Sequence, residues 1–598
     1  MTLIHFRRSA VGALVLFLSA SISAPAGNAE ARSEFYAVTK KPASFTVIDR
    51  SKREVLATVP LDGTPFDAVL GAGNTRAYVL QGPEEKGGLS EISVVDLATR
   101  TVAARIPVEQ SVRRLYWSID KRFLICASAS SVVLFDPMKN EVVATKTPGR
   151  LSFKTLFTPD ASRFFFISGA ERANKEKGTP AHQPSITTFS LEQKDPLADV
   201  ELPDVSAAVL SPDGKWLYVL DPGNPDKKPE RHRDAAVAVI EVETGKIAAT
   251  HSIGIQPREL SSDLDNGVVT VFARQTAKET ATNLYIFRGK DAPTKLEAGE
   301  EASGLRSLGS DGVRVILARD SLRFLDKDSN LLRSTVPLSL PSGDKPGEAL
   351  PLSDCDRLVI SVVDRIGEPT GKLAIVDLKQ RTVSKEVTTG RGKIRFLKNA
   401  LAAADAGMAL ASSARMVSDP TYRAAYIRNP SLYNYGNLYS PPAPNPHVAA
   451  GPQGKFVYAF NAQTGDITVL ASDDGAILKT IPFGNCDYIL PLPGGKFMVA
   501  RNRGSILLIN TATHDFVEYK VPGFFRSLYV FRDSPLMAAL TGKGLLFWET
   551  EKGAPLGDLT TLEPVLLLEA PPAAPAQVPA PAPAPHPQRS AETKGEEP

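Results

Sequence analysis

The sequence predicts an all-β protein made of tandem β-propellers of four-stranded blades, with about eleven or twelve blades in total. Three observations lead to this prediction: an apolar pattern recurs along the chain, turn motifs flank it, and helix-period segments are nearly absent across residues 33–556. Units of roughly 40–50 residues with four short strands are typical of propeller blades. One such unit cannot bury both of its faces alone, so it must stack on its neighbours.

The recurring pattern has four residues rich in Val, Ile, Leu and Phe, followed by a residue that is often acidic. Its copies end at Asp49, Asp96, Asp136, Ser190, Glu241, Arg288, Asp326, Asp377, Ala471, Asn510 and Glu549. Successive copies are 38 to 54 residues apart, except for one interval of 94 residues between Asp377 and Ala471. That interval contains either a degenerate twelfth copy or an insertion.

Turns lie on both sides of each copy. After the copy that ends at Glu241 come a turn, Glu243–Lys246, and a further strand, Ile247–Thr250. Before it comes the hairpin Ser211–Val219, SPDGKWLYV, in which Pro sets φ and Gly tolerates positive φ. The flanking runs are β-branched and aromatic, which favours strands.

Ser211–Val219, together with Val239–Pro257, resembles the YVTN-type β-propeller repeat. The shared features are the Ser-Pro-Asp-Gly turn, the Tyr-Val strand, a strand pair joined at Thr-Gly, and a Gly-x-x-Pro end. Thr46–Pro65 and Ser93–Pro107 match more loosely. The resemblance implies a propeller over nearly the whole mature chain, of the kind found in exported bacterial surface and periplasmic proteins. It is poorly specific for function, because similar propellers occur in lactonases, quinoprotein amine dehydrogenases and haem nitrite reductases.

Eleven or twelve blades exceed the four to eight that one ring usually holds, so two rings are expected. Residues 32–345 would form the first, with about seven blades, and residues 346–565 the second, with about five. The stretch Pro341–Pro351 is the predicted joint. Residues 566–598 are predicted to be a disordered Pro/Ala-rich tail, because Pro-Ala repeats favour extended polyproline II and cannot form a core.

Residues 1–31 have the features of a secretory signal peptide. Arg7 and Arg8 precede an apolar run, Ala10–Ile22, and small residues suited to cleavage lie near Ala26–Ala31. The apolar run is too short to be a stable membrane anchor. We therefore expect a periplasmic or secreted bacterial protein with no transmembrane anchor in the mature chain.

Charge and cysteine content exclude several classes of function. The formal net charge of +3 gives no electrostatic case for binding nucleic acid. Cys126, Cys355 and Cys486 are far apart and lie in or beside apolar runs, so we expect buried thiols and no zinc or haem motif. Two acidic stretches, 263–267 and 326–330, resemble fragments of calcium loops but fit plain β-turns better. No catalytic residue, cofactor or metal site is predicted.

Long connections occur at one place in the repeat, before the apolar pattern and between the second and third strands of a blade. They are Gly82–Leu89, Gly169–Ser185, Pro222–Asp234, Arg274–Thr282 and Arg365–Gly371. Equivalent loops of a propeller emerge on one face, so this distribution suggests a binding face. The alternative is that they are tolerated solvent loops.

The 94-residue interval contains a Tyr/Pro-rich segment, Ser418–Pro446. Tyrosine and arginine are favoured at protein interfaces, because they combine a rigid contact area with polar ends. The candidate partner-binding residues are Tyr422, Arg423, Tyr426, Arg428, Tyr433, Tyr435 and Tyr439. The alternative is a loop that packs its tyrosines on its own propeller.

These observations favour an exported binding or scaffold protein that docks an envelope protein or glycan through a loop-rich face. The alternative is a periplasmic propeller enzyme, either a lactonase-like hydrolase or a quinone- or haem-linked oxidoreductase. Propeller active sites assemble from several blades, so no local motif would identify one. We expect a binding protein rather than an enzyme.

Overall fold

The computed structural model describes residues 34–389 and 448–568, apart from short turns and loops inside these ranges. Its described residues form 43 strands in antiparallel sheets, with two short 3-10 turns, η1 (Ala72–Asn74) and η4 (Pro452–Gly454). The predicted all-β class is confirmed. Among the described residues, no helix is long and apolar enough to cross a membrane.

The strands form four-stranded units, which we call blades and number along the chain. Each blade is given from its innermost to its outermost strand. Blade 1 consists of β43 (Pro564–Leu568), β1 (Glu34–Lys40), β2 (Ala43–Asp49) and β3 (Glu54–Pro60), and blade 2 of β4 (Thr64–Leu70), β5 (Arg76–Gly82), β6 (Ser90–Asp96) and β7 (Thr101–Val108). Blade 3 consists of β8 (Arg114–Trp117), β9 (Leu124–Ala127), β10 (Val132–Asp136) and β11 (Glu141–Lys146), and blade 4 of β12 (Ser152–Phe157), β13 (Arg163–Ser168), β14 (Ser185–Ser190) and β15 (Pro196–Glu201). Blade 5 consists of β16 (Ala207–Leu210), β17 (Trp216–Asp221), β18 (Ala235–Glu241) and the first part of β19 (Ile247–Asp263), and blade 6 of the second part of β19, β20 (Val268–Arg274), β21 (Ala281–Phe287) and β22 (Thr294–Glu300). Blade 7 consists of β23 (Gly304–Leu308), β24 (Val313–Leu317), β25 (Ser321–Leu325) and β26 (Leu332–Pro337), and blade 8 of β27 (Lys345–Pro351), β28 (Arg357–Val363), β29 (Pro369–Asp377) and β30 (Thr382–Thr388). Blade 9 consists of β31 (Val448–Ala450), β32 (Phe456–Asn461), β33 (Asp466–Ala471) and β34 (Ile477–Pro482). Blade 10 consists of β35 (Tyr488–Pro491), β36 (Phe497–Arg501), β37 (Ser505–Asn510) and β38 (Phe516–Lys520), and blade 11 of β39 (Phe525–Val530), β40 (Leu536–Thr541), β41 (Gly544–Glu549) and β42 (Ala554–Leu559).

The long strand β19 belongs to two blades. Its first part pairs with β18 and its second part with β20, so blades 5 and 6 form one seven-stranded sheet. The described residues thus contain eleven four-stranded blades.

The copies of the apolar pattern coincide with the third strands of these blades. A third strand has a neighbour on each edge and a blade against each face, so its side chains are buried without alternation. In β2, for example, the five residues Ser44–Ile48 are all buried, whereas the outermost strand β3 is largely exposed. Burial on both faces is why the pattern reads as a continuous apolar run.

The acidic residue after the pattern forms the turn to the fourth strand. Asp49 Oδ1 accepts hydrogen bonds of 2.8 Å from the backbone N–H groups of Ser51 and Lys52. Asp96 and Asp377 do the same in blades 2 and 8. The backbone hydrogen bond from Lys52, with smaller contributions from Ser51, holds the pKa of Asp49 below its usual value. The recurring acidic residues are therefore turn formers.

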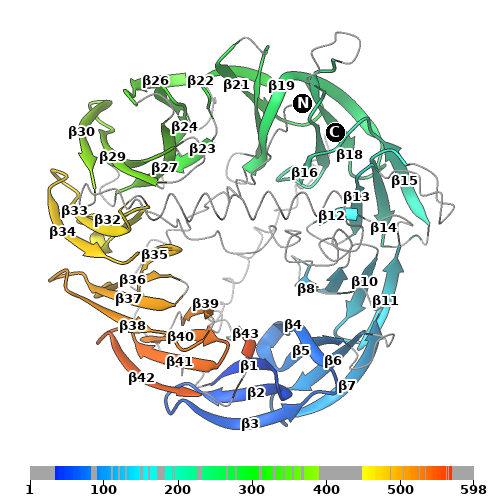
Figure 1. Ribbon diagram of the computed structural model, residues 1–598. Helices are drawn as coiled ribbons and strands as arrows, with labels where there is room; N and C mark the ends of the chain where they lie inside the picture. Colours follow the sequence, from blue (N-terminus) through cyan, green and yellow to red (C-terminus); the bar gives the residue numbers. More distant parts are fainter. Residues whose placement is uncertain are drawn as a thin grey trace, which may run out of the picture.

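The blades close into one ring (Figure 1). The described core consists of eleven hydrophobic clusters, and each lies between two successive blades, including blades 11 and 1. At the closure, the ring of Phe35 packs edge-on against Phe531 and Phe547, with centroids 4.9 and 6.1 Å apart. The last strand, β43, completes blade 1 by pairing with β1.

This arrangement differs from the expected pair of tandem rings. The predicted boundary at residues 345 and 346 falls in β27, and blades 7 and 8 share one hydrophobic cluster across it. The physical reason is strand β43: it joins the end of the chain to blade 1, so the circuit closes once, between blades 11 and 1. Leu566–Leu568, which were expected in the tail, belong to this strand.

The 94-residue interval is an insertion between blades 8 and 9. These two blades share a cluster that includes Val359, Ile375, Val457 and Leu470, so they are in direct contact. Residues 390–447, which contain most of the interval, lie outside the described residues. The predicted signal peptide and the rest of the Pro/Ala-rich tail also lie outside them.

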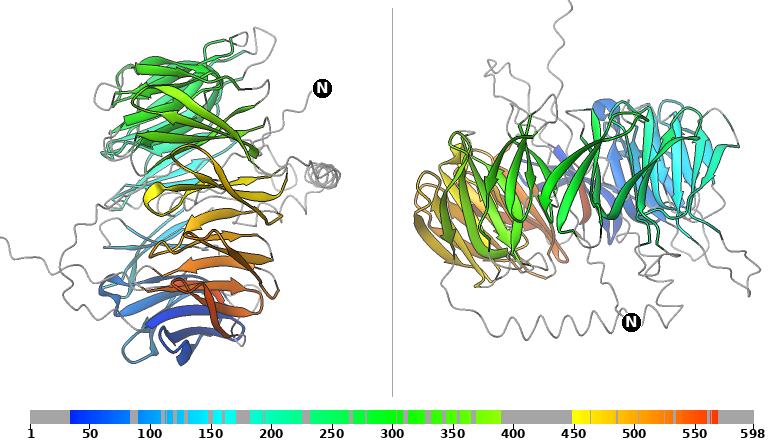
Figure 2. Two further views of the ribbon diagram at one scale, coloured as in Figure 1. Left: turned by 90° about the vertical axis from the view of Figure 1, so that its left-hand side faces the viewer. Right: turned by 90° about the horizontal axis from the view of Figure 1, so that it is seen from above.

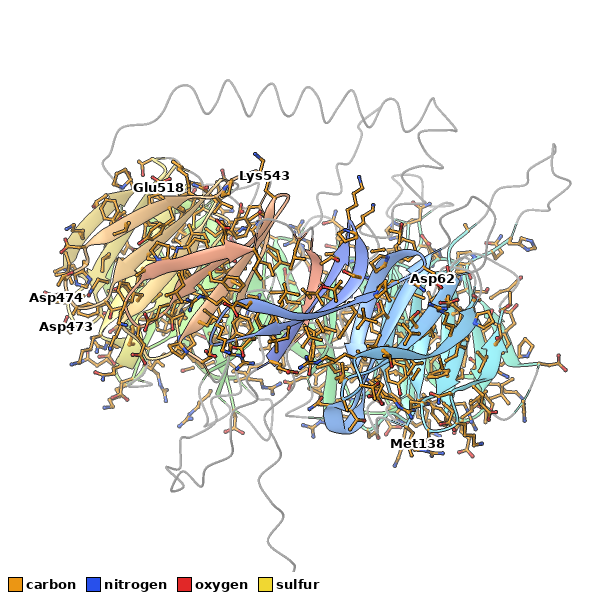
Figure 3. The ribbon with its side chains drawn as sticks, turned by 90° about the horizontal axis from the view of Figure 1, so that it is seen from below. Asp62, Met138, Asp473, Asp474, Glu518 and Lys543 are labelled. Carbon is orange, nitrogen blue, oxygen red and sulfur yellow. The ribbon has the colours of Figure 1, made fainter. Side chains whose placement is uncertain are left out.

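The ring has two different faces, which Figure 2 shows from the side. Strands alternate in direction within every blade, so the connections between strands 1 and 2 and between strands 3 and 4 share one face, which we call the turn face. Connections between strands 2 and 3, and from one blade to the next, lie on the opposite loop face. In Figure 3, Met138, from a turn between strands 3 and 4, lies opposite Lys543, from a turn between strands 2 and 3.

Candidate functional site

The long connections all belong to the loop face. The five predicted in the sequence join β5 to β6, β13 to β14, β17 to β18, β20 to β21 and β28 to β29, which are second and third strands. Their predicted common position is confirmed, although their central residues lie outside the described residues. The insertion 390–447 joins β30, the outermost strand of blade 8, to β31, the innermost strand of blade 9. It therefore also starts and ends on the loop face.

The predicted partner-binding side chains all lie in this insertion and outside the described residues, so the structure does not place them. They are Tyr422, Arg423, Tyr426, Arg428, Tyr433, Tyr435 and Tyr439. Their role stays a prediction. What the structure does describe is the pair of strands from which the insertion emerges.

A buried polar cluster holds the first end of the insertion. The backbone N–H and the hydroxyl of Thr389 both donate to the carbonyl oxygen of Gly371, each at 2.7 Å. The Nδ2 group of Asn461 donates to the carbonyl oxygen of Thr389 at 2.8 Å. Thr389 and Asn461 are both buried. These bonds join the end of blade 8 to the long 2–3 connection of the same blade and to blade 9.

Gly371 is the residue that lets this cluster close. Its φ is +79°, and a Cβ atom there would lie 2.0 Å from Nδ2 of Asn461. A side chain would therefore be strained in the backbone and would displace the amide that holds Thr389. Beside it, Lys372 Nζ lies 3.0 Å from Asp344 Oδ2 in a partly exposed ion pair. The root of the insertion is thus held by hydrogen bonds on both neighbouring blades.

A second connection on this face, 222–234, is closed at its base. The buried Asp221 accepts a hydrogen bond of 2.9 Å from the backbone N–H of Gly223 and also contacts the guanidinium group of Arg233. Asn224 and Arg233 exchange backbone hydrogen bonds of 2.8 and 2.9 Å. His232 Nε2 lies 3.1 Å from Asp234 Oδ1 at the surface. These bonds hold the two ends of the connection together at its base.

The innermost strands carry charged residues that link adjacent blades. Register shifts interrupt β4 near Asp67 and β12 near Lys154, and such bulges redirect side chains. Asp67 Oδ2 accepts from the backbone N–H of Leu115 at 3.0 Å, and Lys154 Nζ donates to the carbonyl of Ala208 at 2.6 Å. Burial raises the pKa of Asp67 and lowers that of Lys154. Their bonds to the next blade give them a structural role, and no local motif in the sequence indicated them.

The thiols in the described part of the chain are poor candidates for nucleophiles. Cys126 and Cys486 are free and buried, as predicted, while Cys355 lies outside the described residues. Burial raises the pKa of the Cys126 thiol and raises that of Cys486 to about 12. Because the thiolate is the reactive form, neither supports nucleophilic catalysis at neutral pH.

The two calcium-like stretches are only partly described. Asp263, in the first, forms an ion pair with the fully buried Arg314, with Nη1 and Oδ2 3.2 Å apart. No group of three or more metal-ligating side chains occurs among the residues that the structure describes. The carboxylate of Asp263 is therefore already paired with the cationic side chain of Arg314.

Comparisons with known proteins give no family for this chain. No family model and no curated protein matches it. Among solved structures, a eukaryotic initiation factor matches with 12% identity and a TM-score of 0.38, over 72% of this chain and 93% of that one. Dihydro-heme d1 dehydrogenase NirN, in complex with DHE, matches with 11% identity and a TM-score of 0.34, over 82% and 74%. The hydrazine synthase of Kuenenia stuttgartiensis matches with 15% identity and a TM-score of 0.26, over 52% and 93%. Likenesses at this level carry no inference about activity, and the β-propeller assignment rests on the strand pairing described above.

Proposed function

We propose that this chain is an exported β-propeller of the YVTN type that binds a protein or glycan of the bacterial envelope through its loop face. The observation that carries the proposal is that the five long 2–3 connections and the insertion 390–447 all emerge on this one face of the ring. Insertions scattered by neutral drift would be distributed over both faces. Loops displayed by a rigid scaffold are where repeat proteins commonly bind their partners.

The root of the insertion supports the same role. Thr389 is held by Gly371 and Asn461, so the insertion begins from a fixed point between two blades. Fixing one end of a binding segment lowers the entropy that is lost when a partner orders it. The Tyr- and Arg-rich composition of Ser418–Pro446 suits a contact surface. Residues 1–31 supply the features expected for export.

The test is a cross-linked capture from native envelope extract with three baits. The first is the chain from residue 32 onward. The second has Ser418–Pro446 replaced by a Gly-Ser linker of equal length. The third has residues 225–231 replaced in the same way, as a control on the same face but on a distant blade. Parallel extracts treated with protease distinguish a protein partner from a glycan.

The captured partner is then purified and titrated against each bait. We expect the affinity to fall at least tenfold for the second bait and to change less than threefold for the third. Equal affinity of the purified partner for the first two baits contradicts the proposed role of the insertion. If no bait captures a partner and the purified chain instead carries a chromophore and turns over a substrate, the oxidoreductase alternative replaces the proposal.

A further inference from the structure

A hollow of about 490 Å³ lies between blades 2 and 3 on the turn face, opposite the loop face. We call it the blade 2–3 hollow. It lies beside η1, the first turn of blade 2, and the turns of blade 3. The residues important for the argument are Arg76, Tyr78, Trp117, Arg122, Phe123 and Met138.

Aromatic side chains form the floor of the hollow. The rings of Tyr78 and Trp117 meet edge to face, with centroids 5.9 Å apart. The Trp117 Nε1 group donates to the carbonyl of Leu70 at 2.9 Å, so its polar end is already bonded inside the protein. Met138 is 87% exposed at the rim. The hollow therefore offers aromatic and thioether surface for apolar contact.

Two guanidinium groups border this apolar surface. Arg76 lies at the start of β5, where its Nη1 is 3.3 Å from Asn140 Oδ1, and Arg122 lies over the ring of Phe123 at 5.1 Å. The nearby carboxylate of Asp136 accepts the backbone N–H of Met138 through Oδ1 at 2.8 Å. The border thus places arginine hydrogen-bond donors beside the aromatic surface.

Aromatic rings flanked by donors suit a proline-rich strand in polyproline II form. Such a strand has no internal hydrogen bonds, so its carbonyl groups are free to accept from arginine while its proline rings pack on tyrosine and tryptophan. It is also pre-ordered, so binding costs it little entropy.

The chain after β43 has the composition of such a strand, and it leaves the ring near this hollow. Strand β43 is the innermost strand of blade 1, and Leu568 at its end pairs with Tyr36 near the start of β1. This is the position of a turn between strands 1 and 2, so the chain leaves the ring on the turn face, beside blade 2. The 17 residues 571–587 that follow contain eight prolines. In polyproline II form they span about 50 Å, which is several times the roughly 10 Å between packed sheets.

We propose that the segment Pro571–Pro587 binds in the blade 2–3 hollow of its own ring, as an extended polyproline II strand. The segment needs only to pass the first turn of blade 2 to reach the hollow. This intramolecular site is on the opposite face from the proposed partner site, so either proposal can fail without the other.

The matched control site is the equivalent hollow between blades 5 and 6. It is lined by Ser211, Asp213, Trp216, Tyr218, Arg288 and Gly289. It has the same second-strand tyrosine, Tyr218, but Trp216 occupies the position that Arg76 has in blade 2, and no methionine lines it. It also lies three blades farther from β43 along the ring.

The experiment places the photo-cross-linking residue p-benzoylphenylalanine at Met138 in the chain from residue 32 onward. A control protein carries it at Lys290, an exposed residue of the turn beside the blade 5–6 hollow. After irradiation, the cross-linked peptides are identified by mass spectrometry at two protein concentrations a hundredfold apart.

We expect the probe at Met138 to link to residues 571–587 of the same chain, with a yield that does not change on dilution and is at least fivefold above that at Lys290. Replacing residues 571–587 by a Gly-Ser linker leaves the ring untouched and should abolish this product, and Trp117→Leu should reduce it at least fivefold. Equal yields at the two probes, links only between separate chains, or no link to the segment would each overturn the proposal.

Discussion

Two tyrosines on equivalent second strands differ in one hydrogen bond. Tyr218 donates its hydroxyl to the carbonyl of Gly289 at 2.9 Å, across blades 5 and 6. Tyr458 occupies the same place in blade 9, and its buried hydroxyl has no hydrogen-bond partner among the described residues. The two side chains are 1% and 0% exposed. Because the aromatic ring stays buried in both variants, substitution by phenylalanine measures the contribution of the hydroxyl group to stability.

The expected effects have opposite signs. Tyr218→Phe removes one hydrogen bond and leaves the Gly289 carbonyl unpaired, so we expect a loss of about 1 kcal/mol in the free energy of unfolding. Tyr458→Phe removes a buried hydroxyl whose desolvation is not compensated, so we expect a gain of about 1 kcal/mol. The difference between the variants should be roughly 2 kcal/mol.

Urea denaturation of both variants gives the midpoint and the m-value. A change in the midpoint at constant m reports stability. Because a ring of many blades can unfold in steps, amide hydrogen exchange in β17, β21 and β32 provides a local measurement. If both variants lose stability by the same amount, the assignment of one bonded and one unbonded hydroxyl is wrong.

Two further predictions concern the same strands and turns. Burial raises the pKa of Tyr218 and of Tyr458 to about 12. In the unfolded chain tyrosines ionise near pH 10, so their contribution is complete below about pH 10 and is lost as the pH rises toward 12. Denaturation midpoints from pH 9 to 12 should fall less steeply in the double Phe variant, and an unchanged slope would contradict the prediction. Gly245→Ala should lower stability by about 1–2 kcal/mol more than Gly267→Ala. Both glycines have φ near +65° to +69°, but a Cβ at Gly245 would lie 2.8 Å from Cβ of Ala198, whereas Gly267 has open space. Equal shifts in thermal unfolding would argue against this contact.

The sequence predicted the blades because their signal is local. A third strand is buried on both faces, and its closing acidic residue forms a turn with the next few residues, so both features occur within about ten residues. Asp49 and its hydrogen bonds to Ser51 and Lys52 are one example.

Ring closure was not predictable in the same way. Strand β43 is a single five-residue run, PVLLL, directly before a proline-rich tail, and its partner β1 lies more than 500 residues earlier. No local sequence feature indicates which strand will pair with β43. The number of blades in a ring depends on the packing angle between blades, which the repeat length does not determine.

The candidate site was predicted only in part. The positions of the long connections follow from intervals between copies of the apolar pattern. The cluster that holds the insertion does not, because Thr389 bonds to Gly371 at a separation of 18 residues and to Asn461 at 72. All three are ordinary residue types for turns, so their assembly is visible only in the folded ring.

The pairing of the first and last strands can be tested directly by a disulfide. Ala37 and Leu567 are opposite one another in β1 and β43, and directly opposed residues of antiparallel strands are about 4.5–5.5 Å apart, within the range that a disulfide spans. The variant Ala37→Cys/Leu567→Cys is oxidised and its tryptic peptides are compared with those of Ala37→Cys/Leu317→Cys, which joins blade 1 to blade 7. A single closed ring predicts an intrachain disulfide between residues 37 and 567 and none between residues 37 and 317. A disulfide to residue 317, with none to residue 567, would show that the first seven blades close on themselves and would contradict the single ring.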